Sequence, residues 1–441
     1  MNRRRFTQQL AAAVGAISLG RVARGDGAPV PSSLRVDGDR INRHLVELSQ
    51  FGKNPYGGVS RVAYSEVDRQ GRAWAMGVMR EARLTVSIDA AGNIVGRRPG
   101  SVASLKPIVF GSHIDSVPDG GNYDGDVGSL SAIEVARTLA VSDLVTRHPL
   151  EVIIFQNEEG GTVGSRALTG EVHADDLAIK SISGKTIGDG IVFLGGDLSA
   201  LASVRRAPGD VAAYVELHIE QGGNLDREKI DIGVVEGIVG IGQWEVTTEG
   251  FANHAGTTAM SDRRDSLLAT ARYIDMVHRV ITSTPGRQVG TVGRVQAFPG
   301  APNVIPGKVI FTLEIRDLDQ TKVDTLAARV RAEGEVIGRD TGCAFTYAPL
   351  HQSRPAVCDE RVKQVIEASA RGLSLSTTHL PSGAGHDAQH MARLGPAGMI
   401  FVPSVRGISH APTEFTKPQD VVNGANVLLQ AILALDTAPW T

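Results

Sequence analysis

The sequence predicts an α/β protein in which a second, α+β domain interrupts the first. With 441 residues, 42% of them hydrophobic and 21% charged, the chain can build two or three globular domains. Before about Gly237 and after Pro355, apolar runs alternate with helical patterns, which favours an α/β layered fold. Between Gly237 and Gln352, strand patterns of period two predict a half-exposed sheet. A domain inserted within a discontinuous domain is the simplest account.

Residues 1–28 are predicted to be an export signal of the twin-arginine type. Arg3, Arg4 and Arg5 precede Phe6 and an apolar run that is too short to span a membrane as a stable helix. The arginine pair followed by Phe6 resembles the bacterial twin-arginine signal, which implies export of a folded protein to the periplasm. An ordinary basic N-terminus is the alternative. No Cys follows the apolar run, so we expect no membrane anchor once the signal is removed.

Net charge and cysteine content restrict the partners. The formal net charge is −3 and no basic cluster follows the N-terminus, which argues against nucleic acid or an anionic membrane surface and favours a small molecule. The chain has 2 cysteines, Cys343 and Cys358. This number is too small for a disulfide scaffold, so we expect free thiols that bind no metal.

Residues 33–236 form the predicted first part of the α/β domain. "PIVFGSH" is a buried strand that ends at His113, "GSLSAIEVARTLAV" is a helix, and "LEVIIFQNEEGG" is a second buried strand, which leads into Glu158 and Glu159. Because α/β proteins bind ligands at the carboxyl ends of their strands, these polar residues are candidates for a site.

Residues 237–352 form the predicted inserted domain. Its strands are "GQWEVTTEGF", "VGTVGRVQAFPG" and "KVIFTLEIRDL", and its helices lie near Arg264 to Val280 and Thr321 to Gly338. Residues 353–441 complete the first domain, with "GMIFVPS" as its last strand and "ANVLLQAILAL" as its closing helix.

A glycine-rich loop, "GSHIDSVPDGGNYDG", contains His113 and Asp124. A loop that only reversed the chain would need the glycines but not the imidazole. His218 in "YVELHIEQGG" and His410 in "GISHAPTEF" also end or follow predicted strands. Imidazoles together with carboxylates suit a pair of divalent ions about 3.5 to 4 Å apart, with one carboxylate between them. The candidate residues are His113, Asp124, Glu158, Glu159, His218 and His410.

The order of seven motifs resembles that of a known family. "GSHIDSVPDGGNYDG", "NEEGG", "ELHIEQG", "NHAGTT", "PNVIP", "SGAGHDA" and "GISHAPTE" occur in the order and approximate spacing of the amidase/hydantoinase/carbamoylase branch of the M20 metallopeptidase family. The resemblance covers nearly everything after the signal. This branch holds N-carbamoyl-L-amino acid hydrolases, β-ureidopropionases and allantoate amidohydrolases. The resemblance implies a discontinuous di-metal catalytic domain, an inserted dimerisation (lid) domain and a homodimer.

The resemblance also implies the metal ligands. His113 and His218 resemble the terminal ligands of one ion, Glu159 and His410 resemble those of the other, and Asp124 matches the carboxylate that bridges them. Zinc is the first choice for both ions, with manganese or cobalt as alternatives, because imidazole and carboxylate ligands suit all three metals.

Four carboxylates near these ligands receive other roles. Glu158 matches the general base of the family, which takes a proton from the attacking water. Asp115 resembles the carboxylate that orients His113. Asp119 and Asp126 are expected to face solvent.

The family suggests how substrate is held. Arg316 matches the residue that clamps the substrate carboxylate, a task that suits a planar guanidinium. His254 resembles the histidine that polarises the scissile carbonyl in the site of the neighbouring subunit. Other residues that match substrate contacts are Gln221, Asn303, Gly385 and His386.

The chain departs from the family pattern in two places. The usual "HAGTTPM" is here "HAGTTAM", with Ala259 in place of proline. The usual "EEGxRF" is replaced by "EEGGTVGSRAL", which predicts an unusual side-chain specificity.

We therefore expect a periplasmic di-metal amidohydrolase that cleaves the carbamoyl or ureido C–N bond of a small carboxylate substrate, of the N-carbamoyl-L-amino acid, ureidopropionate or allantoate type. Two alternatives stay open. An M20 aminoacylase or dipeptidase would cleave an acyl group instead, against which Arg316 and "HIEQGG" argue. A catalytically silent protein would only capture ureido compounds, against which the intact Glu158 and the full ligand set argue.

Overall fold

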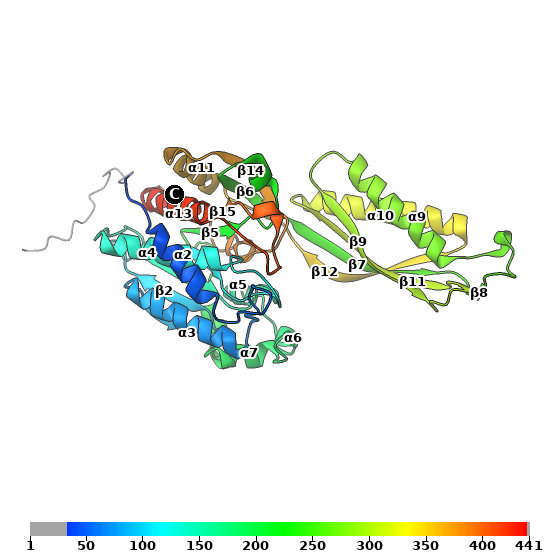
Figure 1. The fold of residues 1–441 in the computed structure, drawn as a ribbon, viewed down its shortest axis with the longest axis horizontal. Helices are drawn as coiled ribbons and strands as arrows, with labels where there is room; N and C mark the ends of the chain where they lie inside the picture. The colour runs from blue at the N-terminus through cyan, green and yellow to red at the C-terminus, as the bar shows by residue number, and fades with distance from the viewer. Residues whose placement is uncertain (1–32, 439–441) are drawn as a thin grey trace, which may run out of the picture.

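The computed structural model describes residues 33–438, and the predicted signal, residues 1–28, lies outside them. Figure 1 shows a larger main domain joined to an elongated inserted domain by the strands β7 (Gly240–Glu249) and β12 (Ala344–Ser353). The chain leaves the main domain once and returns to it once. The predicted fold class, an α/β domain interrupted by an α+β domain, is confirmed.

The main domain is built on a nine-stranded sheet with the order β1-β2-β4-β3-β5-β15-β6-β13, and β14 also pairs with β6. Its four central strands, β4, β3, β5 and β15, are parallel, so their carboxyl ends meet at one edge. The strands are β1 (Thr85–Ile88), β2 (Ile94–Arg98), β3 (Ile108–His113), β4 (Leu150–Phe155), β5 (Ala213–Ile219), β6 (Ile232–Ile238), β13 (Ala356–Val357), β14 (Thr377–Ser382) and β15 (Ala397–Val402).

Helices cover both faces of this sheet. One face packs against α3 (Glu66–Glu81), α4 (Asp126–Val141), α11 (Glu360–Gly372) and α13 (Pro418–Thr437), and α2 (Gly38–Leu48) packs on α4 and α13. The other face packs against α5 (Val163–Thr169) and α12 (Ala388–Met391). The predicted helices of the main domain are α4 and α13, which are buried along most of their length because each lies between the sheet and other helices.

Short helices fill the connections of both domains. They are α6 (Ala174–Leu177), α7 (Ile187–Phe193), η1 (Leu198–Val204), α8 (Asn224–Glu228), η2 (Met260–Asp262) and η3 (Val405–Gly407). Within residues 33–438, no single helix has the length and hydropathy needed to cross a membrane, and α7 and η1 reach them only as a pair bent by 86°.

The inserted domain is an antiparallel sheet with two helices on one face. The strand order is β12-β7-β11-β9, and α9 (Ser266–Ser283) and α10 (Gln320–Thr341) confirm the two predicted helices. The remaining strands are β8 (Asn253–His254), β9 (Val289–Phe298), β10 (Val304–Ile305) and β11 (Lys308–Asp317). Alternate residues of β7 are buried against the helices, which explains the period-two pattern.

The inserted domain has its own core and its own attachment. Trp244, Tyr273 and Phe311 lie in an apolar cluster that includes no residue of the main domain. Its first strand begins at Gly240 and its last strand ends at Ser353, beside predicted bounds of 237 and 352.

The two cysteines lie in different domains. Cys343 and Cys358 are both buried and unbridged, as the sequence predicted.

Candidate active site

The strand order gathers the predicted ligands at one edge of the main sheet. His113 is the last residue of β3, and His218 lies near the end of the neighbouring β5. Glu158 and Glu159 follow β4, and His410 follows β15. Because β4, β3, β5 and β15 are adjacent and parallel, segments that are far apart in the chain place their polar residues together.

Asp124 lies at the centre of this group. Its Oδ1 is 3.1 Å from His218 Nε2 and 3.7 Å from His113 Nε2. Its Oδ2 is 3.1 Å from His410 Nε2, and that nitrogen is 3.6 Å from Glu159 Oε2. Each oxygen of one carboxylate therefore faces a different pair of candidate ligands, which is the arrangement of a bridging ligand.

The backbone around Asp124 is fixed by close contacts. Gly125 has a φ of 67°, and a Cβ atom there would lie 2.5 Å from the ring of His113. Glu414 accepts the backbone N–H groups of Tyr123 and Asp124, at 2.9 and 3.1 Å. A residue other than glycine at position 125 would therefore separate the imidazole from the carboxylate.

A hydrogen bond at Nδ1 determines the tautomer of the His113 ring. Its Nδ1–H donates to the backbone carbonyl of Asp115 at 2.9 Å, so the Nε2 lone pair faces Asp124 and Glu158. The Asp115 carboxylate, predicted to orient this ring, is 3.8 Å from Nδ1 and instead accepts the backbone N–H groups of Glu158 and Glu159. Asp115 thus positions the imidazole through its carbonyl and the two glutamates through its carboxylate.

His218 has the same orientation as His113. Its Nδ1–H donates to the carbonyl of Ile219 at 2.9 Å, and its Nε2 is buried and not aligned for a hydrogen bond with Asp124. Burial acts to lower the pKa of His218, but the adjacent Asp124 carboxylate outweighs it and raises the pKa to about 9. A ring nitrogen so placed gains from a positive charge between it and the carboxylate, whether a proton or a metal ion.

The distances between these donor atoms show whether the residues could bind metal ions. Two groups of donor atoms lie close enough to share an ion: His113, Asp124 and His218 form one, and Asp124, Glu159 and His410 form the other. Glu159 Oε1 is buried and has no hydrogen-bond partner in residues 33–438. Unpartnered buried nitrogen and oxygen atoms that converge on one carboxylate are costly unless they bind a cation. The residues therefore fit two divalent ions that share Asp124.

A third group, Glu216, His218 and His386, does not make a separate site. Glu216 already accepts hydrogen bonds from Ser112, Tyr214 and the backbone of Ala388, at 2.9 to 3.0 Å. A carboxylate with three donors has little need of a metal ion.

Glu158 lies beside the ligands without belonging to either group. Its Oε2 is 3.7 Å from His113 Nε2, and its side chain is buried. Burial, together with the charges of Asp387 and Glu159, raises the pKa of Glu158 well above its usual value. A carboxylate with a high proton affinity and no ligand role suits a general base.

The expected exposure was wrong for one of two aspartates in this loop. Asp119 is exposed, as predicted. Asp126 is only 1% exposed, and both of its oxygens accept from Arg61 Nη2, at 2.8 and 2.6 Å. Arg61 also donates to the carbonyl of Ile114, so this buried ion pair braces the loop that carries the ligands. Asp126 is the first residue of α4. The apolar helix pattern that follows it in the sequence is typical of a buried helix, so burial of Asp126 agrees with that pattern.

Three of the predicted substrate contacts, Gln221, Gly385 and His386, line one large cavity together with the candidate ligands. Gln221 has a φ of 57° and donates from Nε2 to Asp124 Oδ2 at 2.8 Å, so it touches the candidate bridging carboxylate directly. His386 Nε2 and Ser382 Oγ are 2.9 Å apart, and the His386 ring centroid is 4.4 Å from that of His218.

The predicted contacts from the inserted domain are not brought to this cavity within one chain. His254 on β8 and Asn303 beside β10 are exposed, and Figure 1 shows β8 at the end of the inserted domain farthest from the main domain. Arg316 lies nearer, on β11, where it donates to Glu314 at 2.7 Å and to the carbonyl of Gly383 at 2.6 Å. It does not line the cavity.

Sequence reasoning gave no role to two residues that hold the candidate bridging carboxylate. Ser409 Oγ lies 3.1 Å from Asp124 Oδ2 and 2.7 Å from Glu414 Oε2. Both residues stand in the "GISHAPTEF" motif beside His410. A hydroxyl and a carboxylate within a few residues of a candidate ligand were the signal that could have identified them.

Most of the chain matches one family of known proteins. Peptidase family M20/M25/M40 matches residues 109–434. The chain belongs to this family. This confirms the resemblance drawn from the ordered motifs, and M20 enzymes are metal-dependent, in agreement with the candidate ligand groups.

Relatives of this M20 protein match it over almost its whole length. An N-carbamoyl-L-amino acid amidohydrolase from Geobacillus stearothermophilus is 38% identical over 405 residues, covering 91% of this chain and 99% of the relative. A ureidoglycolate hydrolase from Oryza sativa subsp. japonica is 37% identical over 426 residues, covering 93% and 87%. The crystal structure of an amidase of the hydantoinase/carbamoylase family from Burkholderia multivorans has a TM-score of 0.86 at 37% identity, covering 92% of this chain and 100% of that one.

Proposed function

We propose that this protein is a di-metal amidohydrolase that cleaves the carbamoyl or ureido C–N bond of a small carboxylate substrate. Relatives whose names describe such reactions are 33 to 38% identical to most of the chain. The observation that carries the proposal is the Asp124 carboxylate, whose two oxygens face two different pairs of ligand atoms.

Divalent ions held by these residues would supply Lewis acidity for the substrate carbonyl and make a water molecule nucleophilic near neutral pH. The side chains of this protein perform the other tasks. Glu158 accepts the proton of the attacking water and then returns it to the leaving nitrogen, because it is a buried carboxylate that lines the cavity beside His113 and belongs to neither ligand group. For an N-carbamoyl amino acid, the products are the amino acid, ammonia and carbon dioxide.

The inserted domain completes the site in this proposal. Arg316 lies at the end of β11 next to the main domain, beside the Gly383 carbonyl, and binds the substrate carboxylate once its contact with Glu314 is exchanged. His254 lies too far along the inserted domain to serve its own chain, so it stabilises the developing oxyanion in the site of a second subunit. The proposed active unit is therefore a homodimer. The predicted twin-arginine signal supports a periplasmic location, and zinc is the first choice of metal for these ligands.

The reaction is tested by a matched set of substrates. Carbamoyl, acetyl and glycyl derivatives of one amino acid are compared by release of the free amino acid, with ammonia measured in parallel. We expect turnover of the carbamoyl compound and ammonia release in a one-to-one ratio with the amino acid. Preferential cleavage of the acetyl or glycyl compound would assign the chain to an aminoacylase or dipeptidase activity instead.

The shared site is tested by mixing two inactive variants, Glu158→Gln and His254→Ala. If each subunit uses the His254 of its neighbour, a mixed dimer contains one site with both changes and one site with neither, and activity returns. Native mass spectrometry would verify that mixed dimers form. Mixed dimers without activity would place His254 in its own site or outside catalysis.

A further inference from the structure

The cavity beside the candidate ligands is large, and most of the residues that line it have polar side chains. It has a volume of about 810 Å³, and apart from glycines its lining includes only two apolar residues, Ile241 and Ala384. Small-molecule sites are usually lined mostly by apolar side chains. An apolar substrate group would remove water from charged and amide groups here without replacing their hydrogen bonds, which is unfavourable.

One wall of the cavity comes from the segment that departs from the family pattern. After Glu159 the chain turns through Gly161 and Thr162 into α5, and Thr162 and Arg166 line the cavity. Thr162 has a φ of 51°, a conformation that β-branched residues rarely adopt. The segment that differs from the family pattern therefore lines the cavity, where its side chains can affect which substrates bind.

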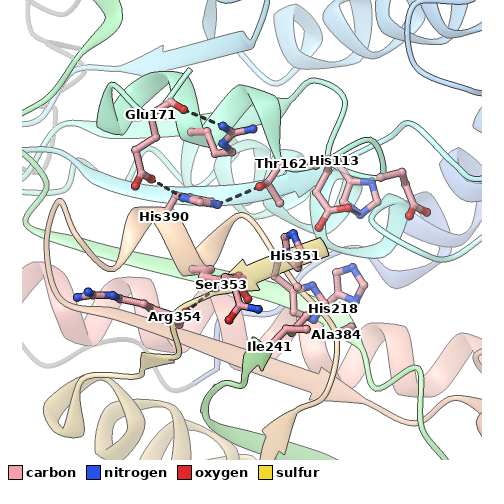
Figure 2. A pocket seen from close by; sticks show the side chains of 18 of the residues that line it. His113, Thr162, Glu171, His218, Ile241, His351, Ser353, Arg354, Ala384 and His390 are labelled. Atoms are coloured by element: carbon pink, nitrogen blue, oxygen red, sulfur yellow. Dashed lines mark hydrogen bonds and ion pairs between the residues drawn. The ribbon is translucent and has the colours of Figure 1, made fainter. Parts of the chain in front are cut away.

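The polar groups of this wall satisfy one another. His390 Nδ1 donates to Glu171 at 2.9 Å, so His390 Nε2 accepts from the Thr162 hydroxyl, also at 2.9 Å. Burial lowers the pKa of His390 to about 4, so the ring is neutral at pH 7. Arg393 pairs with the other carboxylate oxygen of Glu171, the one that His390 does not contact. Figure 2 shows this row of contacts from Glu171 through His390 to Thr162.

The second arginine of the wall is also paired. Arg166 Nη2 lies 3.0 Å from Asp176 and 2.8 Å from the carbonyl of Glu171. Two guanidinium groups thus face two carboxylates, and the wall has no uncompensated charge from these residues.

The opposite wall carries a cation without such a partner. Arg354 follows the last strand of the inserted domain, and Figure 2 shows it across the cavity from His390. Among residues 33–438, no carboxylate pairs with its guanidinium, in contrast to Arg166 and Arg393. Its backbone carbonyl accepts from Gln389 Nε2 at 2.7 Å, which fixes this part of the chain to the main domain.

We propose that this end of the cavity is a subsite for a second anionic group of the substrate, held by Arg354. The substrate class is then a carbamoyl or ureido derivative of a dicarboxylic acid, with one carboxylate for Arg316 and the other for Arg354. Arg354 is the specificity-determining residue because it carries the unpaired charge, and the paired wall opposite supplies neutral hydrogen-bonding groups. The assignment rests on the proposed amidohydrolase function and deepens it.

The test compares two substrates of nearly equal size, N-carbamoyl-L-aspartate and N-carbamoyl-L-asparagine. For the unchanged protein, we expect kcat/KM for the aspartate compound to exceed that for the asparagine compound by about 10- to 100-fold, the range for a hydrogen bond to a charged group. Arg354→Ala should bring this ratio close to one, chiefly by raising KM for the aspartate compound. Arg354→Lys should restore part of the preference, and Arg354→Glu should reverse it.

The matched control is Arg80→Glu, which makes the same change of charge at an exposed position of α3 outside the cavity. It should leave the ratio unchanged. Equal losses for both compounds in Arg354→Ala would overturn the proposal, because Arg354 would then hold the carboxylate that both share. An unchanged ratio would overturn it as well.

Binding separates this proposal from the proposed function. Calorimetric titration of the Glu158→Gln protein with the two compounds should give tighter binding of the aspartate compound by a similar factor. Tighter binding without hydrolysis in the unchanged protein would keep the subsite and reject the activity. Hydrolysis of both compounds with equal affinities would keep the activity and reject the subsite.

Discussion

The two ends of the cavity use similar side chains in opposite ways. At the candidate metal end, Asp124, Glu158 and Glu159 face imidazoles, and no Arg or Lys pairs with them among the described residues. At the other end, Glu171 and Asp176 each pair with an arginine. The first end is incomplete without added cations, whereas the second is already neutral except for Arg354. Charge balance therefore separates the candidate site for chemistry from the proposed site for recognition within one cavity.

The largest expected effect comes from removing a ligand at the incomplete end. Asp124→Asn and His218→Ala should each abolish turnover and lower the metal content below about two ions per chain, because both residues converge on the same pair of ions. Elemental analysis of the purified variants, together with ammonia release, measures both effects. A fully active protein without divalent metal would contradict the contrast between the two ends, since the negative charge of the carboxylates would then not be compensated by metal ions.

A smaller loss is expected from Glu158→Gln, which leaves the ligands in place. Turnover should fall by about 10² to 10⁴, the usual contribution of a general base, while both ions stay bound. The matched change, Glu159→Gln, should instead lose metal. Activity near that of the unchanged protein in Glu158→Gln, with metals retained in Glu159→Gln, would exchange the two roles.

The loop that carries Asp124 should show an effect on stability rather than on chemistry. Asp126→Asn leaves the buried Arg61 without its charged partner, which costs about 3 to 5 kcal/mol of unfolding free energy. Asp119→Asn, an exposed change in the same loop, should stay within about 0.5 kcal/mol. Chemical denaturation of the metal-free proteins compares the two. Equal values would mean that the Arg61 pair does not brace the loop.

The smallest effect is expected at the neutral end and depends on pH. The pKa of His390 is lowered from 6.5 to about 4, so its neutral form stabilises the fold above pH 6.5, and this contribution is lost as the pH falls from 6.5 to 4. His390→Gln should remove that part of the acid sensitivity, about 3 kcal/mol at most, because an amide replaces both hydrogen bonds without titrating. Denaturation between pH 7 and 4.5 measures it, with exposed His278→Gln as the control. An unchanged pH dependence would mean that His390 does not titrate with unfolding.

The sequence predicted the main-domain part of the site well because local patterns determine it. Each ligand ends or follows an apolar strand, and parallel neighbouring strands bring such positions together without further information. The burial of Asp126 could not be predicted in this way, because it depends on an ion pair with Arg61, which lies in a different loop. The role of the Asp115 carboxylate was assigned by resemblance, and only the backbone geometry shows which groups it accepts from.

The recognition end was not predictable in the same way. Thr162, Glu171, His390 and Arg354 come from three separate segments with no periodicity or motif in common. Their pairing depends on how α5, α12 and the end of β12 meet, which is a property of tertiary packing. The sequence indicated only that the "EEGGTVGSRAL" segment departs from its family.

The attachment of the inserted domain has a consequence for how such chains can be recombined. Ile241 and Ser353 are register partners on β7 and β12, so the chain leaves and rejoins the main domain at neighbouring points. A short hairpin turn could close this gap, and neither apolar core would lose a residue, because the two cores are separate. The insertion is thus an exchangeable module: grafting a different domain at this junction would change which surface the subunit offers to other proteins, while the strands that carry the candidate ligands stay as they are.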